Sequence, residues 1–229
     1  MSDKIKMLFP HQKKFIEYSQ KDCYNKDGFL LFHSTGKGKT ITSLGWAMNY
    51  PNNLINLIIP SYLKFHWLTN INKIIPNNSK KKINFISYNN FFEKPEKYIN
   101  KIKDNLLIID EAHYICKHFN NPENKNLNKI LDVLKTPHKL LLLSATPIYD
   151  SILDLSLLVN ICAKKKVMNI SEKGFYDKYG EINTKKKEKL NFIFDWYKNF
   201  QTSFWKRMLI RLVKLIFTIV QYSVIIFSL

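Results

Sequence analysis

Residues 33–40 read His-Ser-Thr-Gly-Lys-Gly-Lys-Thr and directly follow the apolar run Phe29–Phe32. A loop of this composition between a strand and a helix predicts a cradle for phosphate groups. Gly36 and Gly38 have no side chain, so their backbone N–H groups can approach an anion closely. The positive end of the following helix would add to the attraction. The alternative interpretation is a glycine-containing turn that arose by chance.

Within this loop, two side chains have expected roles at a nucleotide. Lys39 is placed to reach the β- and γ-phosphates, and the Thr40 hydroxyl is placed to bind Mg²⁺. The strict form of the loop has glycine where this chain has His33. We expect a nucleoside triphosphate to be bound by the loop residues Ser34, Thr35, Gly36, Lys37, Gly38, Lys39 and Thr40.

A second signal is Asp110-Glu111-Ala112-His113, which follows the apolar run Leu106–Ile109. Two carboxylates leaving a buried strand at its carboxyl end lie where open parallel sheets bind ligands. We expect Asp110 to hold Mg²⁺ and Glu111 to orient and deprotonate an attacking water. With Lys39, they are the candidate catalytic residues. The alternative is that both acids simply cap the next helix.

A third, weaker signal is Ser144-Ala145-Thr146, again at the end of an apolar run. The small hydroxyl side chains of Ser144 and Thr146 can hydrogen-bond a neighbouring acid without filling a cleft. Alone, this tripeptide indicates only a turn.

Apolar runs of four to six residues without alternation are typical of strands that are covered on both faces. Between them lie segments with helical periodicity, so the chain predicts an α/β fold with one parallel sheet and helices on both faces. The predicted strands are Phe29–Phe32, Leu54–Ile59, Ile83–Ser87, Leu106–Ile109 and Leu140–Leu143. The predicted helices are Thr40–Met48, Tyr62–Ile75, Phe91–Ile102 and Leu127–Leu134.

Composition restricts the class of protein. The 229 residues carry a formal net charge of +18, which suits a polyanionic partner better than a basic one, although lysine enrichment is also typical of AT-rich genomes. The three cysteines are far apart, which excludes a disulfide framework and fits a reducing compartment. The amino-terminal residues show no signal peptide, so we expect an intracellular, non-secreted protein.

We expect three segments along the chain: a nucleotide-binding domain over 1–163, a Lys-rich linker or helical extension over 164–203, and an apolar carboxyl-terminal tail over 204–229. The extension is expected to be helical and apolar. Its last 15 residues carry no charge, fewer than the roughly 20 that span a bilayer. Three interpretations of the tail stay open: a membrane anchor, a helix packed on the domain, or the out-of-register end of a disrupted gene.

Taken in order, Gly-Lys-Gly-Lys-Thr, Asp-Glu-Ala-His and Ser-Ala-Thr resemble motifs I, II and III of superfamily-two helicases of the DEAH-box type. Further detail is similar to the helicase-like ATPases of large DNA viruses, namely the poxvirus-type early-transcription and transcript-release ATPases. This detail lies in His33-Ser34-Thr35-Gly36, in Pro60-Ser61-Tyr62-Leu63 with Trp67, in Ser87-Tyr88-Asn89 and in Ser144–Tyr149. The resemblance covers about residues 8–162 and implies a single RecA-like domain.

The resemblance also implies roles for further residues. Gln12 would read the adenine edge, with a polar residue at the start of a surface helix as the alternative, and His113 would couple the nucleotide site to an opposing domain together with Ser144 and Thr146. Contacts to a nucleic-acid backbone, DNA or RNA without sequence specificity, are implied for Pro60, Ser61, Lys64, Ser87 and Tyr88. For the neighbouring Tyr62, Phe65 and Trp67 the alternative is packing between helix and sheet, which we favour for Trp67 and for Leu63.

The implied function is ATP binding and hydrolysis by the first half of a nucleic-acid-dependent helicase or translocase, cytoplasmic or virion-associated and acting in viral transcription. The family completes its site with arginines from a second RecA-like domain, whereas the only arginines here are Arg207 and Arg211. We therefore expect weak or no activity from the chain alone and a partner chain carrying the second domain. The alternatives are a truncated, non-catalytic remnant that binds ATP or nucleic acid, and a membrane-tethered adaptor with an ATPase fold.

Overall fold

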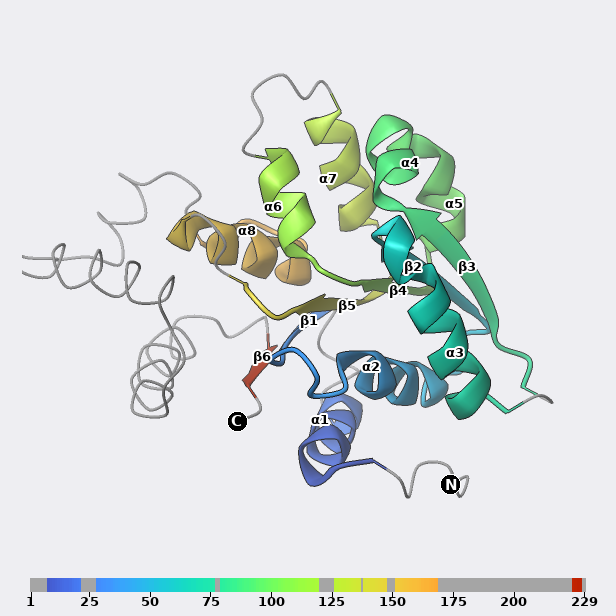
Figure 1. The fold of residues 1–229 in the computed structure, drawn as a ribbon. Helices are drawn as coiled ribbons and strands as arrows, with labels where there is room; N and C mark the ends of the chain where they lie inside the picture. The colour runs from blue at the N-terminus through green and yellow to red at the C-terminus, as the bar shows by residue number, and fades with distance from the viewer. Residues whose placement is uncertain are drawn as a thin grey trace, which may run out of the picture.

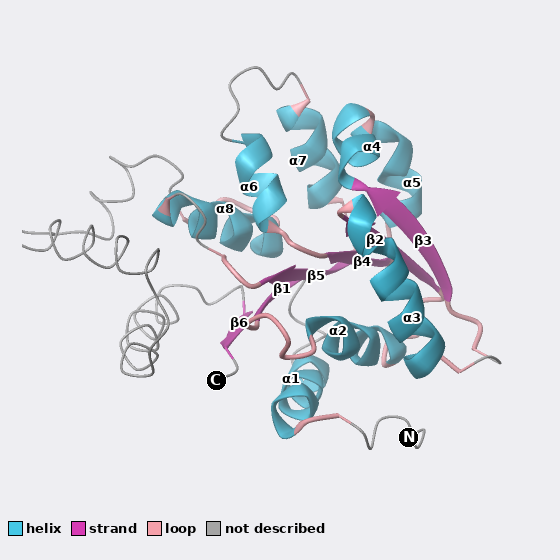
Figure 2. Ribbon diagram, viewed as in Figure 1, coloured by secondary structure: helices cyan, strands magenta, loops and turns pink. Residues whose placement is uncertain are grey.

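A parallel sheet runs through the part of the chain that the computed structural model describes: residues 8–21, 28–76, 79–119, 126–136, 138–147 and 151–168, with the backbone alone of 224–227. Helices cover both faces of this sheet (Figures 1 and 2). The strands are β1 (Gly28–Phe32), β2 (Leu54–Ile59), β3 (Lys82–Ser87), β4 (Leu106–Ile109), β5 (Lys139–Ser144) and β6 (Val224–Phe227), in the spatial order β3-β2-β4-β5-β1-β6.

The five strands predicted from apolar runs are confirmed as β1 to β5, with ends that differ by at most one residue. All paired strands in the sheet are parallel, so their carboxyl ends share one edge. Because β5 lies between β1 and β4, the segments that follow these three strands are neighbours in space although they are far apart in the chain.

Two hydrophobic clusters lie on the two faces of the sheet, and the buried apolar residues of β1 to β5 enter one or the other, largely in alternation. In β1, Phe29 and Leu31 join the cluster that contains residues of α1, α2 and α3. Leu30 joins the opposite cluster, which contains residues of α4 to α8. The helices are α1 (Pro10–Lys21), α2 (Lys39–Met48), α3 (Lys64–Ile74), α4 (Tyr88–Glu93), α5 (Ile99–Ile102), α6 (His113–Phe119), α7 (Leu127–Lys135) and α8 (Ile152–Ala163), with 3₁₀ turns η2 (Ser61–Leu63) and η3 (Pro95–Tyr98).

The helix predicted over residues 91–102 is interrupted. Helix α4 begins earlier, at Tyr88, and ends before Lys94, whose backbone leaves the helical region (φ −139°, ψ 65°). The next residue is Pro95, which lacks an N–H donor and disfavours helical geometry in the residue before it. The segment therefore continues as η3 and the short helix α5.

The carboxyl-terminal extension differs from the expected apolar helix at the four residues that the structure describes. Val224–Phe227 form strand β6, paired in parallel with β1. Three of the four are β-branched, which favours a strand, and β1 would otherwise present an unpaired edge. The rest of the predicted tail and most of the predicted linker lie outside the described residues. No helix within the described ranges is long and apolar enough to cross a membrane.

Candidate nucleotide site

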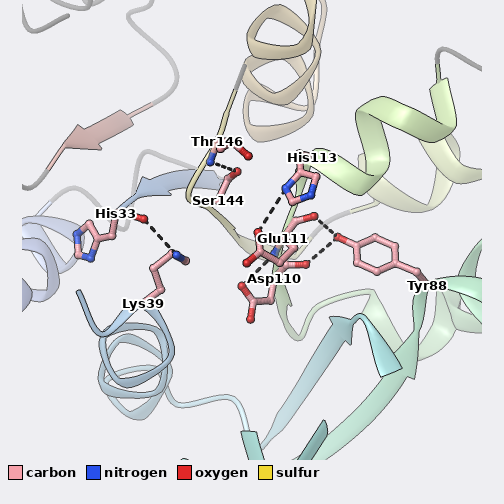
Figure 3. Close-up of polar contacts among 8 residues, drawn as sticks. All are labelled: His33, Lys39, Tyr88, Asp110, Glu111, His113, Ser144 and Thr146. Atoms are coloured by element: carbon pink, nitrogen blue, oxygen red, sulfur yellow. Dashed lines mark hydrogen bonds and ion pairs between the residues drawn. The ribbon is translucent and has the colours of Figure 1, made fainter. Parts of the chain in front are cut away.

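The predicted site residues meet at the edge where β1, β4 and β5 end. The His33 N–H donates to the Ser144 carbonyl oxygen (3.3 Å), and the Ala112 N–H donates to the Leu143 carbonyl oxygen (2.9 Å). These bonds tie together the segments that follow the three strands. Figure 3 shows Lys39 on one of these segments, Asp110 and Glu111 on the second, and Ser144 on the third.

The loop after β1 has the backbone of an anion cradle. Gly36 and Gly38 both have left-handed backbone angles (φ 76° and 75°), which glycine adopts without a Cβ penalty. A Cβ on Gly38 would lie 2.3 Å from the Gln12 side-chain nitrogen. Gly38 also precedes the first turn of α2, and no side chain caps that turn. Ser34 to Lys37 are exposed, so the N–H groups at this helix end face an accessible loop.

Lys39 and Thr40 begin helix α2 at the loop. The Lys39 ammonium donates to the His33 carbonyl oxygen at 3.1 Å, so the Lys39 side chain points back toward the loop that precedes α2 (Figure 3). Thr40 is largely buried at 9% exposure. The structure thus places both residues beside the loop as the sequence predicted, while their roles toward phosphate and Mg²⁺ stay predictions.

His33, which replaces the glycine of the strict loop, is fully buried. Its ring packs edge-on to that of His11, with 5.3 Å between ring centroids. Burial, together with the charges of His11 and Lys39, lowers the pKa of His33 to about 4. His33 is therefore a neutral packing residue at physiological pH.

Gln12 joins α1 to the loop. Its side-chain oxygen accepts from the Phe9 N–H (2.9 Å), and its side-chain nitrogen lies 3.4 Å from both the Lys37 and the Gly38 carbonyl oxygens. Both functions of the amide are thus engaged within the chain. Reading adenine with them, as the sequence predicted, would require these bonds to be exchanged.

Asp110 is held by hydrogen bonds from two directions. The indole N–H of Trp67, which lies in α3, donates to one carboxylate oxygen (2.9 Å), and the Glu111 N–H donates to the other (2.9 Å). Asp110 is only 5% exposed. Burial raises the pKa of Asp110, and the Trp67 hydrogen bond opposes that rise. A buried carboxylate oriented in this way is a suitable ligand for a hard cation.

Glu111 has an unusual backbone and an ionised side chain. Its φ is 54°, in the left-handed region that residues with a Cβ rarely adopt. The carboxylate lies 3.3 Å from the His113 ring nitrogen Nδ1. This hydrogen bond lowers the pKa of Glu111, burial works against it, and the Lys39 charge lowers it further. Glu111 therefore stays a carboxylate at neutral pH and can accept a hydrogen bond from water.

Ser144 and Thr146 form their own turn after β5. The fully buried Ser144 hydroxyl accepts from the Thr146 N–H at 3.0 Å (Figure 3). Within the described residues, neither side chain is bonded to Asp110 or Glu111. The predicted coupling role of the pair thus remains a prediction.

The five predicted nucleic-acid contacts fall into two groups. Ser61 and Lys64 are exposed after β2, and Ser87 is half-buried at the end of β3. Pro60 and Tyr88 are buried, and their predicted contact with a nucleic-acid backbone stays a prediction. Tyr88 is 4% exposed, because its ring packs into the core and its hydroxyl turns toward the Asp110–Glu111 turn.

The aromatic residues after β2 divide between core and surface. Trp67 is fully buried and Leu63 packs against the same cluster, as we favoured. Tyr62 and Phe65 are 70% and 81% exposed, so packing between helix and sheet does not account for them. The sequence analysis missed the hydrogen bonds of Trp67 and Tyr88 to the Asp110–Glu111 segment. These bonds join residues far apart in the chain, and the one general signal for them is that a buried indole or phenol usually finds a hydrogen-bond partner.

A family model described as "SNF2-related domain" matches residues 76–214, more than half of the chain. Among curated proteins, a protein of Acanthamoeba polyphaga mimivirus named as an ATP-dependent RNA helicase is 35% identical over 159 residues, covering 68% of this chain and 32% of the relative. The early transcription factor 70 kDa subunit of Fowlpox virus is 30% identical over 182 residues, covering 72% of this chain and 28% of the relative.

A third relative, nucleoside triphosphatase I of Choristoneura fumiferana entomopoxvirus, is 31% identical over 170 residues, covering 65% of this chain and 26% of the relative. The chain thus spans about a quarter to a third of the length of these relatives. Among solved structures, the SWI2/SNF2 ATPase core of Sulfolobus solfataricus in complex with double-stranded DNA matches with a TM-score of 0.55 at 19% identity. That match covers 81% of this chain and 42% of the archaeal chain, and it shows a shared fold.

Proposed function

The chain belongs to the family of SNF2-related domains, and on this premise we propose that it binds Mg²⁺ and ATP at the 33–40 loop and hydrolyses the ATP in response to nucleic acid. It is a helicase-like ATPase domain related to viral nucleoside triphosphatases and to a viral early transcription factor. The predicted resemblance to the helicase-like ATPases of large DNA viruses is thereby confirmed.

The observation that carries the proposal is that the glycine loop with Lys39 and the turn with two carboxylates follow β1 and β4 at the same end of a parallel sheet. The charge of Lys39 favours the ionised form of Glu111 and of Asp110, although burial dominates the pKa of Asp110. The residues present fit a bound nucleotide. The glycine loop and the uncapped start of α2 suit the phosphates, and the buried oxygens of Asp110 and Thr40 suit Mg²⁺.

Each residue then has a distinct task. Lys39 would exchange the His33 carbonyl for the β- and γ-phosphates, and Thr40 and Asp110 would hold Mg²⁺. When bound, Mg²⁺ supplies positive charge against the phosphate oxygens. Glu111, kept ionised by His113, would orient the attacking water and take up its proton. Trp67 fixes the Asp110 carboxylate against rotation.

We propose that nucleic acid binds along the surface after β2 and β3, at Ser61, Lys64 and Ser87. The net charge of +18 favours a polyanion, and such backbone contacts carry no sequence information. One relative is named as an RNA helicase and one similar structure contains double-stranded DNA, so both nucleic acids are candidate ligands.

We further propose that residues 1–163 form the ATP-binding unit and that full activity needs a second RecA-like domain. Lysine cannot supply the planar donor fork of arginine, and such an arginine contributes about 10³–10⁵ in rate in other nucleotide hydrolases. The viral relatives support a site of action within the cell or the virion. A membrane anchor in the tail remains a proposal only for the part of residues 204–229 that precedes β6, because Val224–Phe227 pair with β1.

ATP hydrolysis with and without nucleic acid tests the proposed function. We expect slow turnover by the parent chain, stimulation by single- or double-stranded nucleic acid, no strand separation, and loss of turnover in Glu111→Gln. Glu93→Gln is the matched control, since Glu93 is a surface glutamate whose carboxylate pairs with the exposed Lys94. ATP binding without turnover would indicate the non-catalytic alternative, and detergent-dependent recovery from membranes would indicate the adaptor. Turnover that survives in Glu111→Gln would refute the assignment.

A further inference from the structure

The Tyr88 hydroxyl holds the backbone of the Asp110–Glu111 turn. Its single proton is shared in a bifurcated hydrogen bond between the Asp110 carbonyl oxygen at 2.9 Å and the Glu111 carbonyl oxygen at 3.1 Å (Figure 3). Tyr88 comes from a different part of the chain, as the first residue of α4, directly after β3. A buried side chain thus bonds the main chain of both predicted catalytic acids at once.

The turn that Tyr88 holds is strained. Glu111 is in the left-handed region (φ 54°), which is costly for a residue with a Cβ. A buried hydrogen bond stabilises by an amount of the same order as this cost. The Tyr88 bond can therefore decide whether Glu111 keeps this conformation, and with it the direction of the Glu111 carboxylate.

The ring of Tyr88 is itself fixed in place. It stacks on Tyr114 of α6, with 5.2 Å between centroids and 25° between planes, and it packs against Phe92 of its own helix at 5.2 Å. Its neighbour Ser87 caps α4 by accepting from the Asn90 N–H (3.3 Å). A displacement of the start of α4 would therefore move the hydroxyl that bonds the turn.

Trp67 makes a similar connection, from the segment after β2 to Asp110. The segment after β2 contains the predicted contacts Ser61 and Lys64, and its helix α3 reaches Asp110 through the Trp67 indole. The segment after β3 contains the predicted contact Ser87 and reaches Glu111 through the Tyr88 hydroxyl. Each of the two segments assigned to nucleic acid thus ends in one hydrogen bond to the acid pair.

We infer that Tyr88 is a positioning residue, which holds Glu111 in its active backbone conformation and links that conformation to nucleic acid bound at Ser87. This inference rests on the proposed function for its kinetic consequence. The hydrogen bonds and the backbone angle on which it is built are independent of any activity.

The test is Tyr88→Phe, which removes the hydroxyl and keeps the ring. Tyr98→Phe is the matched control, because Tyr98 packs against Phe91 in the same hydrophobic cluster and its hydroxyl is not bonded to the turn. In kinetics, we expect the KM for Mg²⁺·ATP to stay the same in Tyr88→Phe while kcat with nucleic acid falls about fivefold, as expected for the loss of one hydrogen bond. A fall in kcat of the same size in Tyr98→Phe would overturn the inference.

Amide hydrogen exchange provides a readout that does not need turnover. We expect exchange of residues 111–114 to be about fivefold faster in Tyr88→Phe than in the parent or in Tyr98→Phe. A single-stranded oligonucleotide of mixed sequence should slow this exchange in the parent and not in Tyr88→Phe. Unchanged exchange in Tyr88→Phe would overturn the inference. A parent that shows these exchange effects but hydrolyses no ATP would instead refute the proposed function.

Discussion

Replacing Trp67 with phenylalanine isolates the hydrogen bond that orients Asp110. The indole N–H donates to the Asp110 carboxylate at 2.9 Å, and the two residues are 0% and 5% exposed. A hydrogen bond to a charged group contributes about 1.5–3 kcal/mol to stability, and water has little access to replace it here. Trp67→Phe also removes buried ring atoms, so the cost of the hydrogen bond must be separated from that of lost packing.

Trp46→Phe provides that separation. Trp46 is 1% exposed and belongs to the same hydrophobic cluster as Trp67. Its indole N–H, unlike that of Trp67, has no hydrogen-bond partner in the described part of the chain. Both substitutions delete the same atoms from the same face of the sheet. We therefore expect Trp67→Phe to lower the free energy of unfolding by about 1.5–3 kcal/mol more than Trp46→Phe does.

Urea denaturation at neutral pH, followed by far-ultraviolet circular dichroism, measures this difference. Because the Trp67 bond opposes the rise in the pKa of Asp110, Trp67→Phe should also weaken Mg²⁺ binding in the presence of ATP, and Trp46→Phe should not. Equal destabilisation by the two substitutions, with equal Mg²⁺ affinity, would show that the indole contributes packing alone.

Three further predictions concern salt, pH and the loop. Nucleic-acid affinity should fall by orders of magnitude between 50 and 200 mM salt if about six phosphates are contacted, as measured by fluorescence anisotropy; a flat titration would contradict the electrostatic account. Burial lowers the pKa of His138 from 6.5 to about 3, so between these values the unfolded chain binds a proton that the folded chain does not. Stability should thus fall with acidification by about 1.4 kcal/mol per pH unit from this group, and urea titrations of His138→Gln should show a shallower slope than the parent. Gly38→Ala should destabilise the protein more than Gly36→Ala, because both positions have a left-handed backbone but only the Gly38 Cβ meets another atom, the Gln12 side-chain nitrogen; equal melting temperatures would refute the observed loop geometry.

The sequence predicted the sheet well because its strands are covered on both faces. A run such as Leu106–Ile109 has no polar alternation, and burial on both sides is its stable environment. The glycines of the loop predicted a backbone open to an anion for an equally local reason. At these positions the local sequence favours one backbone structure, so the strands and the loop could be predicted from a single sequence.

Side-chain direction was harder to predict, because several apolar residues compete for one face. Tyr62, Phe65 and Trp67 are close in sequence and all aromatic, and only the rotational phase of α3 decides that Trp67 is buried while Phe65 is exposed. The burial of Tyr88 was not predicted for the same reason. The left-handed backbone of Glu111 has no local sequence signal, since the bonds that hold it come from other strands and helices.

Equilibrium binding of Mg²⁺·ATP to the parent chain and to Lys39→Ala tests the central claim most directly. Lys39 is the cation that the loop presents beside Asp110 and Glu111, so its removal should abolish saturable binding in titration calorimetry. Lys135→Ala, which removes an exposed lysine paired with Asp132, should bind as the parent does. Binding by Lys39→Ala with the affinity of the parent would contradict the assignment of the 33–40 loop as the phosphate site.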